Sequence, residues 1–254
     1  MTVPVAVELR SLTHTYVSER GYTPALGPID LTITEGQFVT VLGPSGCGKS
    51  TLLQILAGFV KPTGGAALVN GEPITGPSHE RGVVFQQATA LLPWKSVRGN
   101  VELGPTLRRV DKAERVRRAE QELARVGLTD FADRPIHELS GGMQQRVQIA
   151  RVLANDAPLL LMDEPFGALD AMTRERLQGE LRDLWKSTGR TVVLITHSVE
   201  EAVALGSRVV VLGQRPGTIV FDQEYPFAAS DTGTETLLDD ADFHLACRAV
   251  RGAV

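Results

Sequence analysis

A glycine-rich stretch that ends in lysine and serine is the first segment of this chain whose residues could do chemistry. It reads Gly43-Pro-Ser-Gly-Cys-Gly-Lys-Ser50 and separates a predicted strand at 38–42 from a predicted helix at 51–57. Glycines allow the backbone to turn its N–H groups toward phosphate oxygens, and the helix adds its positive N-terminal end. Lys49 can reach the outer phosphates of a nucleotide, and the Ser50 hydroxyl is placed to ligate Mg²⁺. The predicted phosphate-binding residues are Gly43, Pro44, Ser45, Gly46, Cys47, Gly48, Lys49, Ser50 and Thr51.

Two adjacent carboxylates follow a second apolar run. Leu159-Leu-Leu-Met162 predicts a buried strand, and Asp163 and Glu164 come at its carboxyl end, the edge at which open α/β sheets bind ligands. A carboxylate there needs a partner or a metal to be tolerated. We expect Asp163 to hold Mg²⁺ through its water shell and Glu164 to polarise an attacking water. By itself this pattern could equally be structural, but together with the glycine-rich stretch it predicts nucleotide hydrolysis.

Length and composition restrict the class of protein. The chain has 254 residues, of which 43% are hydrophobic and 22% charged, values typical of a globular protein with a sizeable core. A net charge of −4 argues against a generally basic nucleic-acid binder. No apolar run approaches the ~18 residues of a membrane-spanning helix. Because there are only two cysteines and no export signal before Val5, we expect a reducing cytosol, and for Cys47 we favour a small residue facing away from phosphate over a redox role.

Hydrophobic patterning predicts an α/β fold with a parallel sheet. Apolar residues at helical spacing predict helices at 111–126, ended by Gly127, and at 171–186. Residues 88–157 contain no convincing strand and are interpreted as a helical insertion. After Pro216, acidic residues without nearby Lys or Arg predict a solvated extension with one short helix at 241–250. Short apolar runs predict strands at 38–42, 82–85, 159–162, 192–195 and 208–212.

The segment Leu139-Ser-Gly-Gly-Met-Gln-Gln-Arg146 resembles the signature of the ATP-binding-cassette (ABC) family, and the resemblance covers residues 5–215 with every motif in order. It implies a phosphate-loop NTPase (RecA-like) core with a small N-terminal antiparallel β region and an inserted helical subdomain, binding ATP and Mg²⁺. The implied divisions are a nucleotide-binding core at 1–87 and 158–215, a signature subdomain at 88–157 and a C-terminal extension at 216–254. In the family the signature faces ATP held by a second copy, a role that falls here on Ser140, Gly141, Gly142 and Gln144.

Other positions match further motifs of the family one by one. Gln86 looks like the glutamine that senses Mg²⁺ and joins the core to the insertion, and Asp170 looks like part of the loop that crosses between subunits. His197 matches the switch histidine that contacts the γ-phosphate. Tyr16 looks like the aromatic that stacks on adenine, with Tyr22 as a competitor. The resemblance implies catalytic roles for Lys49, Gln86, Glu164 and His197, and a Mg²⁺ site at Ser50, Gln86 and Asp163.

Within the family, the chain looks most similar to the ATPase subunits of bacterial taurine, alkanesulfonate and nitrate importers. This implies a peripheral protein on the cytoplasmic face of the inner membrane, bound to integral-membrane permease subunits and paired with itself. An extracytoplasmic solute-binding protein would be an indirect partner, and taurine or another sulfonate is the first choice of solute. The segments that carry the likeness are Gly76-Pro-Ser-His-Glu-Arg-Gly-Val-Val-Phe-Gln86, Leu91-Leu-Pro-Trp94, Asp163-Glu-Pro-Phe-Gly-Ala-Leu-Asp170, His197-Ser-Val-Glu-Glu-Ala202 and Gly213-Gln-Arg-Pro-Gly217.

The expected permease contact is the stretch 86–101. Its segment from Thr89 to Trp94 is more apolar than a solvent loop requires, and an exposed Leu91-Leu-Pro-Trp94 would suit a groove that receives a short helix. Trp94 could equally pack inside its own domain. The motif order does not choose between these two positions.

Two other classes of function are weighed against the importer. A soluble cassette ATPase acting on nucleic acid or ribosomes finds support in the basic run 108–118, but a solvated helix face explains that run better, and we expect no nucleic-acid partner. An adaptor that binds ATP without hydrolysing it is the third possibility. The presence of both Glu164 and His197 argues against the adaptor.

Overall fold

The chain folds into two units, one of which is built from both ends of the sequence. The computed structural model describes residues 3–19, 21–87, 90–230, 237 and 239–254. Unit 1 comprises Met1–Ser78 and Leu181–Val254, and unit 2 comprises His79–Glu180. Among the described helices, none combines the length and the apolar character that crossing a bilayer requires.

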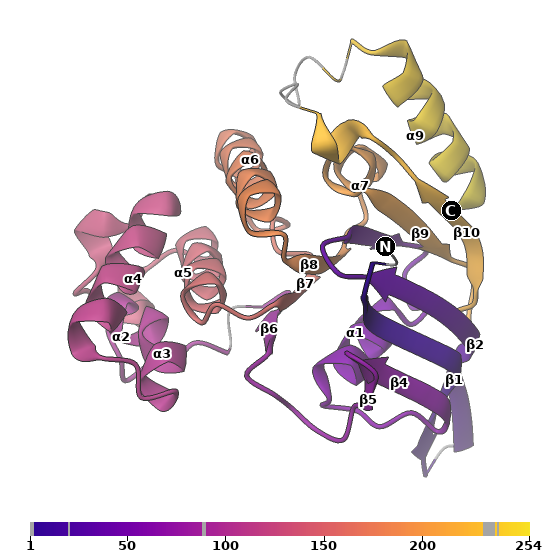
Figure 1. Ribbon diagram of the computed structural model, residues 1–254, viewed down its shortest axis with the longest axis horizontal. Coiled ribbons are helices and arrows are strands. Elements are labelled where there is room, and N and C mark those ends of the chain that lie inside the picture. Colours follow the sequence, from indigo (N-terminus) through magenta and orange to yellow (C-terminus); the bar gives the residue numbers. More distant parts are fainter. Residues whose placement is uncertain (1–2, 20, 88–89, 231–236, 238) are drawn as a thin grey trace. The chain divides into compact units, whose positions relative to one another are not determined.

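An antiparallel sheet begins unit 1 and confirms the predicted N-terminal β region. Its strands are β1 (Val5–Ser18), β2 (Gly21–Thr34), β4 (Gly64–Val69) and β5 (Glu72–Pro73), in the order β2-β1-β4-β5 (Figure 1). Alternate apolar side chains such as Val7, Leu9 and Ile33 are buried, as expected for strands with one covered face. In the β1–β2 hairpin Tyr16 lies opposite Thr23. Tyr16 and Tyr22 therefore come from the two arms of one hairpin.

A mainly parallel sheet carries the two predicted site segments of unit 1. Its strands here follow the order β10 (Ile219–Glu224), β9 (Arg208–Leu212), β3 (Phe38–Leu42) and β8 (Thr191–Ile195). β3 is parallel to β8 and β9, whereas β10 pairs antiparallel with β9. Every residue of β3 and β8 is buried, because strands of this kind are covered on both faces. The helices after these two strands are α1 (Lys49–Ala57) and α7 (Val199–Leu205).

Unit 2 is mainly helical. Between the parallel strands β6 (Arg81–Val84) and β7 (Leu159–Asp163), the described residues 90–157 form helices and no strand, while residues 88 and 89 lie outside the described part. A further helix, α6 (Ala171–Thr188), begins in unit 2 and ends in unit 1. The helices between the strands are α2 (Val97–Val101), α3 (Leu103–Leu107), α4 (Lys112–Arg125) and α5 (Gly141–Ala154), with 3-10 turns η2 (Thr129–Phe131) and η3 (Ile136–Glu138).

Local signals set the limits of α4, which the sequence predicted within one residue at each end. The Asp111 carboxylate caps the helix by accepting the N–H of Ala113. Hydrogen bonds from Arg117 and then Arg118 lower the pKa of Glu114 to about 2. Part of the basic run 108–118 is therefore paired along its own helix face.

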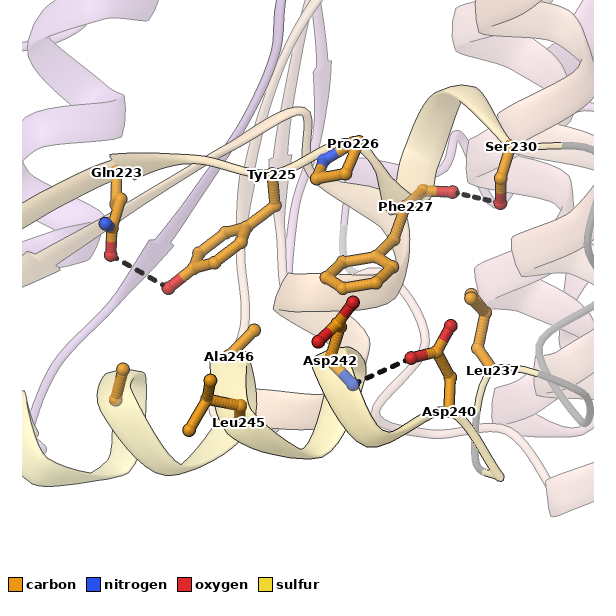
Figure 2. Close-up of a pocket in the computed structure, with 11 residues that line it drawn as sticks. Gln223, Tyr225, Pro226, Phe227, Ser230, Leu237, Asp240, Asp242, Leu245 and Ala246 are labelled. Carbon is orange, nitrogen blue, oxygen red and sulfur yellow. Dashed lines mark hydrogen bonds between the residues drawn. The ribbon is translucent and has the colours of Figure 1, made fainter.

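The C-terminal extension is more ordered than the sequence suggested. After Pro216 the described residues form β10, the 3-10 helix η4 (Phe227–Ala229) and α9 (Ala241–Ala253). The expectation of a solvated segment was wrong for this part, because Phe227, Phe243 and Val250 are buried together with residues of α7 and β9. Phe227 of η4 and Leu245 and Ala246 of α9 line a pocket of ≈ 570 Å³, and Figure 2 shows Phe227 facing α9. Two of the acidic residues used in the prediction, Asp231 and Glu235, lie outside the described residues.

Helical spacing explains why an acidic segment can pack in this way. Ala246 and Cys247 come three and four residues after Phe243, and Val250 comes four and three residues after them, so all of these side chains share one face of α9, and all four are buried. Asp240 caps the helix and accepts the N–H groups of residues 242 and 243. Acidic residues therefore stand at the N-terminus of α9, and its buried apolar residues pack the helix against the core of unit 1.

We expect the thiol of Cys247 to be almost unreactive in the folded protein. Burial, reinforced by the Glu200 carboxylate, raises the pKa of this thiol to about 11, so little thiolate exists at pH 8. In a Cys47→Ser variant, Ellman's reagent at pH 8 should label Cys247 slowly in buffer and quickly in denaturant. Rapid labelling of the folded variant, with circular dichroism unchanged, would contradict the packing of α9.

Candidate functional site

The phosphate loop (residues 43–51) joins β3 to α1 in a conformation that requires glycine. Gly43, Gly46 and Gly48 have φ angles of 149°, 78° and 107°, which side chains rarely adopt. A Cβ on Gly43 would lie 2.4 Å from the carbonyl oxygen of Leu212, and one on Gly48 would lie 2.7 Å from that of Ala25. Since backbone atoms occupy this space, the loop keeps its shape only if these positions carry no side chain.

Lys49 places a positive charge beside the carbonyl groups of its own loop. Its Nζ donates to the carbonyl oxygens of Gly43 at 2.7 Å and Pro44 at 3.0 Å. Ser45 and Ser50 are exposed, whereas Cys47 is buried and suits the expected small, packed residue better than a redox role. An ammonium group next to a glycine-rich turn and a helix N-terminus can bind phosphate groups.

Tyr16, rather than Tyr22, contacts the phosphate loop. The hydroxyl of Tyr16 lies 3.1 Å from Oγ1 of Thr51, and the ring meets that of His14 edge to face at 4.5 Å. Tyr16 is 39% exposed, so part of its side chain is accessible to a ligand, whereas Tyr22 near the hairpin end is 79% exposed. This geometry favours Tyr16 as the ring that could stack on a base next to bound phosphates.

His197 lies two residues after Ile195, the last residue of β8, and hydrogen bonds of its neighbours hold the backbone around it. The N–H of Ser198 donates to Oγ1 of Thr196 at 3.1 Å, and the Ser198 hydroxyl caps α7 by accepting the N–H of Glu201. The N–H of Thr196 donates to the carbonyl of Val41 in β3. These bonds fix the backbone on both sides of His197, whose side chain is exposed.

In unit 2, Asp163 and Glu164 come at the carboxyl end of β7, and Glu164 contacts Gln86. Asp163 is the last residue of the strand. Glu164 adopts a φ of 45°, unusual for a residue other than glycine, and its Oε2 accepts a hydrogen bond from Nε2 of Gln86 at 3.0 Å. Backbone strain of this kind concentrates at functional sites, because the surroundings must enforce it. The structure therefore brings together a carboxylate and an amide that the sequence had placed 78 residues apart.

The signature residues begin α5. Ser140 caps the helix by accepting the N–H of Met143, and Gly142 passes so close to the carbonyl of Ala168 that a Cβ would lie 3.2 Å from it. Gln144 does not point outward as a ligand would, because its amide donates to the carbonyls of Ile136 and Leu139 just before the signature. The Gln144 side chain therefore stabilises the turn that precedes the signature. Ser140 and Gly141 are exposed.

Asp170 ends the loop that passes Gly142. Its carboxylate accepts the N–H of Thr173 at 2.9 Å in the first turn of α6, and this bond lowers the pKa of Asp170. The carboxylate thus stays charged and fixed to the helix while its residue remains exposed.

Two buried glutamines of α5, which sequence reasoning missed, hold the backbone around Gln86. Gln148 accepts the N–H of Phe85 at 3.2 Å and donates to the carbonyl of Gln87 at 2.9 Å. Gln145 donates to the carbonyl of Phe85 at 3.1 Å. Both side chains are at most 1% exposed, and a polar group is buried only where hydrogen bonds compensate its lost hydration. The available signal was the spacing of Gln145 and Gln148, which lie three residues apart and would share one face of a helix.

The predicted site residues are thus divided between the two units. The phosphate loop, Tyr16 and His197 belong to unit 1, and the structure joins Tyr16 to the loop. The remaining residues belong to unit 2, where Gln86 meets Glu164 and the signature meets the loop before Asp170. The residues of unit 2 are Gln86, Asp163, Glu164, Ser140, Gly141, Gly142, Gln144 and Asp170.

Known proteins share both the sequence and the fold. A family model described as ABC transporter matches residues 26–167. The taurine import ATP-binding protein TauB of Roseobacter denitrificans is 51% identical over 88% of this chain and 82% of that protein, and TauB of Pelagibacter ubique is 52% identical over 81% and 77%. The dimeric post-hydrolysis structure of the ATP-binding cassette MJ0796 bound to ADP and Pi superposes with a TM-score of 0.77, at 35% identity, over 86% of this chain and 98% of that one.

These comparisons confirm the resemblance and the fold class predicted from the sequence, a phosphate-loop NTPase fold with an N-terminal antiparallel sheet and a parallel sheet. The chain belongs to the ABC transporter family and is an ATPase.

Proposed function

We propose that this chain is the ATP-hydrolysing subunit of a solute importer, in which two copies close over two ATP molecules. The observation that carries the hydrolytic role is Glu164, whose carboxylate is held by Gln86 at 3.0 Å on a strained backbone at the end of β7. A carboxylate placed in this way can orient and deprotonate water. The direction of transport is supported by the relatives that are named as import proteins.

The remaining groups bind and stabilise the phosphates. The N–H groups of residues 43–51 and the Lys49 ammonium would surround them, and His197 would contact the γ-phosphate. Ser50, Asp163 and Gln86 offer hydroxyl, carboxylate and amide oxygens, a donor set that suits Mg²⁺, which prefers few protein oxygens and retains water. When bound, Mg²⁺ would neutralise charge on the outer phosphates. Phosphoryl transfer to water needs mainly such positioning and charge stabilisation.

The second copy would complete the site. Ser140 and Gly141 are exposed at the N-terminus of the fourteen-residue helix α5, where backbone N–H groups can meet the γ-phosphate of ATP held by the partner. The solved relative that binds ADP and Pi is dimeric. Contacts that exist only with ATP present would favour closure, and loss of phosphate would favour opening. This cycle would drive a partner protein.

That partner would be an integral-membrane permease, with this chain peripheral on the cytoplasmic face of the inner membrane. In the segment 91–94, Leu91 is buried, whereas Trp94 is 76% exposed, so Trp94 is available for an apolar contact. Thr89 of the same stretch lies outside the described residues. An extracytoplasmic binding protein would deliver the solute, and no nucleic acid would be involved. The relatives support taurine as the solute.

The hydrolytic role predicts the behaviour of Glu164→Gln. Turnover of Mg²⁺-ATP should fall by ~100-fold or more, because the amide cannot accept the proton of water. ATP should remain bound, so the variant should elute from gel filtration as a dimer with ATP and as a monomer without it. Glu175→Gln, an exposed carboxylate on α6, is the matched control. An unchanged rate in Glu164→Gln would remove this residue from its proposed role.

The adenine platform is tested with the two tyrosines. Tyr16→Ala should weaken ATP binding by ~10-fold or more, as expected for one lost base–aromatic stack. Tyr16→Phe should retain most of the affinity, since it loses only the hydroxyl contact with Thr51. Tyr22→Ala serves as the comparison, and titration calorimetry with ATP gives the affinities. If Tyr22→Ala lost the affinity and Tyr16→Ala kept it, the assignment would be reversed.

The buried glutamines predict a separation between binding and hydrolysis. Gln148→Leu fits the same space but removes the partners of the Phe85 N–H and the Gln87 carbonyl, which should cost ~1–3 kcal/mol of unfolding free energy. Because Gln86 lies between these two residues, kcat should fall by about tenfold, while the affinity for ATP should change little. Gln121→Leu on the exposed face of α4 is the control. Equal kcat in both variants would show that this network does not position Gln86.

A further inference from the structure

A turn at the end of β9 packs against the phosphate loop from outside. This turn, residues 213–218, is closed by a hydrogen bond from the N–H of Gly213 to the carbonyl of Thr218 at 2.9 Å. Its sequence was noted above only as a mark of subfamily likeness, and the proposed roles of the site do not use it. The segment Gly213-Gln-Arg-Pro-Gly217 thus has a defined position in the structure but no proposed function.

Three hydrogen bonds fix the turn to β2. The N–H of Gly217 donates to the carbonyl of Ala25 at 3.0 Å, and the N–H of Gly27 donates to the carbonyl of Gly217 at 2.9 Å. Nε of Arg215 donates to the carbonyl of Pro24 at 2.9 Å. Ala25 of β2 also lies against Gly48. The turn and the phosphate loop therefore both pack on β2.

Gly217 leaves space that the loop backbone occupies. A Cβ on Gly217 would lie 2.1 Å from the carbonyl oxygen of Cys47 and 3.2 Å from its carbonyl carbon. A contact at 2.1 Å is far inside the van der Waals distance, and the atom in the way is backbone rather than the end of a mobile side chain. Any larger residue at 217 would have to displace the Cys47–Gly48 peptide.

The direction of that peptide decides what the loop can bind. In a planar trans peptide the N–H points opposite to the C=O, so the Cys47 carbonyl, seated on Gly217, directs the Gly48 N–H to the other side. The α-carbon of Gly48 is held against Ala25 and Leu26 of β2, and its carbonyl accepts the N–H of Leu52 in α1. The Gly48 end of this peptide is therefore fixed by β2 and α1.

From this geometry we infer that Gly217 is a positioning residue for phosphate binding: it seats the Cys47 carbonyl outside the loop and thereby aims the Gly48 N–H at the phosphates of ATP or ADP. The inference rests on the proposed role of residues 43–51. It makes the turn part of the nucleotide site through its backbone.

The first experiment compares Gly217→Ala with the wild type by titration calorimetry with ADP and with inorganic tripolyphosphate. Both affinities should fall by about tenfold or more, the effect of one misdirected hydrogen bond to a charged group. Gly76→Ala is the matched control, since a Cβ there meets nothing within 4 Å, and it should bind as the wild type does. Lys49→Ala, which removes the ammonium group of the loop, tests whether the phosphate loop binds these ligands at all. If Lys49→Ala lost affinity and Gly217→Ala did not, the loop assignment would stand and the role of Gly217 would be wrong.

General destabilisation is separated from positioning by two further measurements. Val250→Ala creates a cavity in the α9 cluster, and at a comparable loss of Tm it should retain ADP affinity. In the wild type, the amide proton of Gly48 should move downfield when ADP binds, because a hydrogen bond to phosphate deshields it. This measurement stands even if Gly217→Ala fails to fold. An unmoved Gly48 amide, or an equal loss of affinity in Val250→Ala, would overturn the inference.

Discussion

Close backbone packing without side chains is the constraint on which the nucleotide site of this ATPase depends. Carbonyl groups of Leu212 and Ala25 occupy the space where Cβ atoms of Gly43 and Gly48 would lie. The loop is therefore shaped by its surroundings as well as by its own flexibility, and its N–H groups are arranged before a ligand arrives. Preorganised donors of this kind need no reorganisation when charge develops. The buried strands β3 and β9 provide the rigid frame.

A second constraint applies in unit 2, where hydrogen bonds from buried glutamine side chains, rather than the absence of side chains, fix the backbone. Gln145 and Gln148 of α5 are satisfied by the backbone on either side of Gln86, so the helix that begins at the signature also holds the glutamine that meets Glu164. In a low-dielectric interior such hydrogen bonds are strong, and an unmade one is costly. The signature and the carboxyl end of β7 are thus connected through one helix. In the proposed dimer, the second copy would act at the signature end of this helix.

The local elements could be predicted because their signals are local. The limits of α4 follow from Asp111 and Gly127, and the strands β3 and β9 follow from apolar runs, so all three elements were predicted within one residue of their observed ends. β10 could not be predicted, because Ile219–Glu224 is three apolar residues followed by three polar ones, without the alternation typical of a strand with one covered face, and its partner strand is known only from the fold. Amphipathic spacing in α9 was visible, but the surface that covers it was not.

For the site, the sequence by itself determined which residues could do chemistry, since the phosphate loop, Asp163 with Glu164, and Ser140 with its glycines are contiguous motifs whose function depends on short-range backbone geometry. Only the tertiary structure decided that the Tyr16 hydroxyl contacts Thr51 of the phosphate loop, that Trp94 is exposed and that the Gln144 side chain turns inward. It also revealed the buried glutamines and the seat of Cys47 on Gly217. These depend on contacts between residues far apart in the chain, which strand register and helix packing fix and which no local pattern encodes.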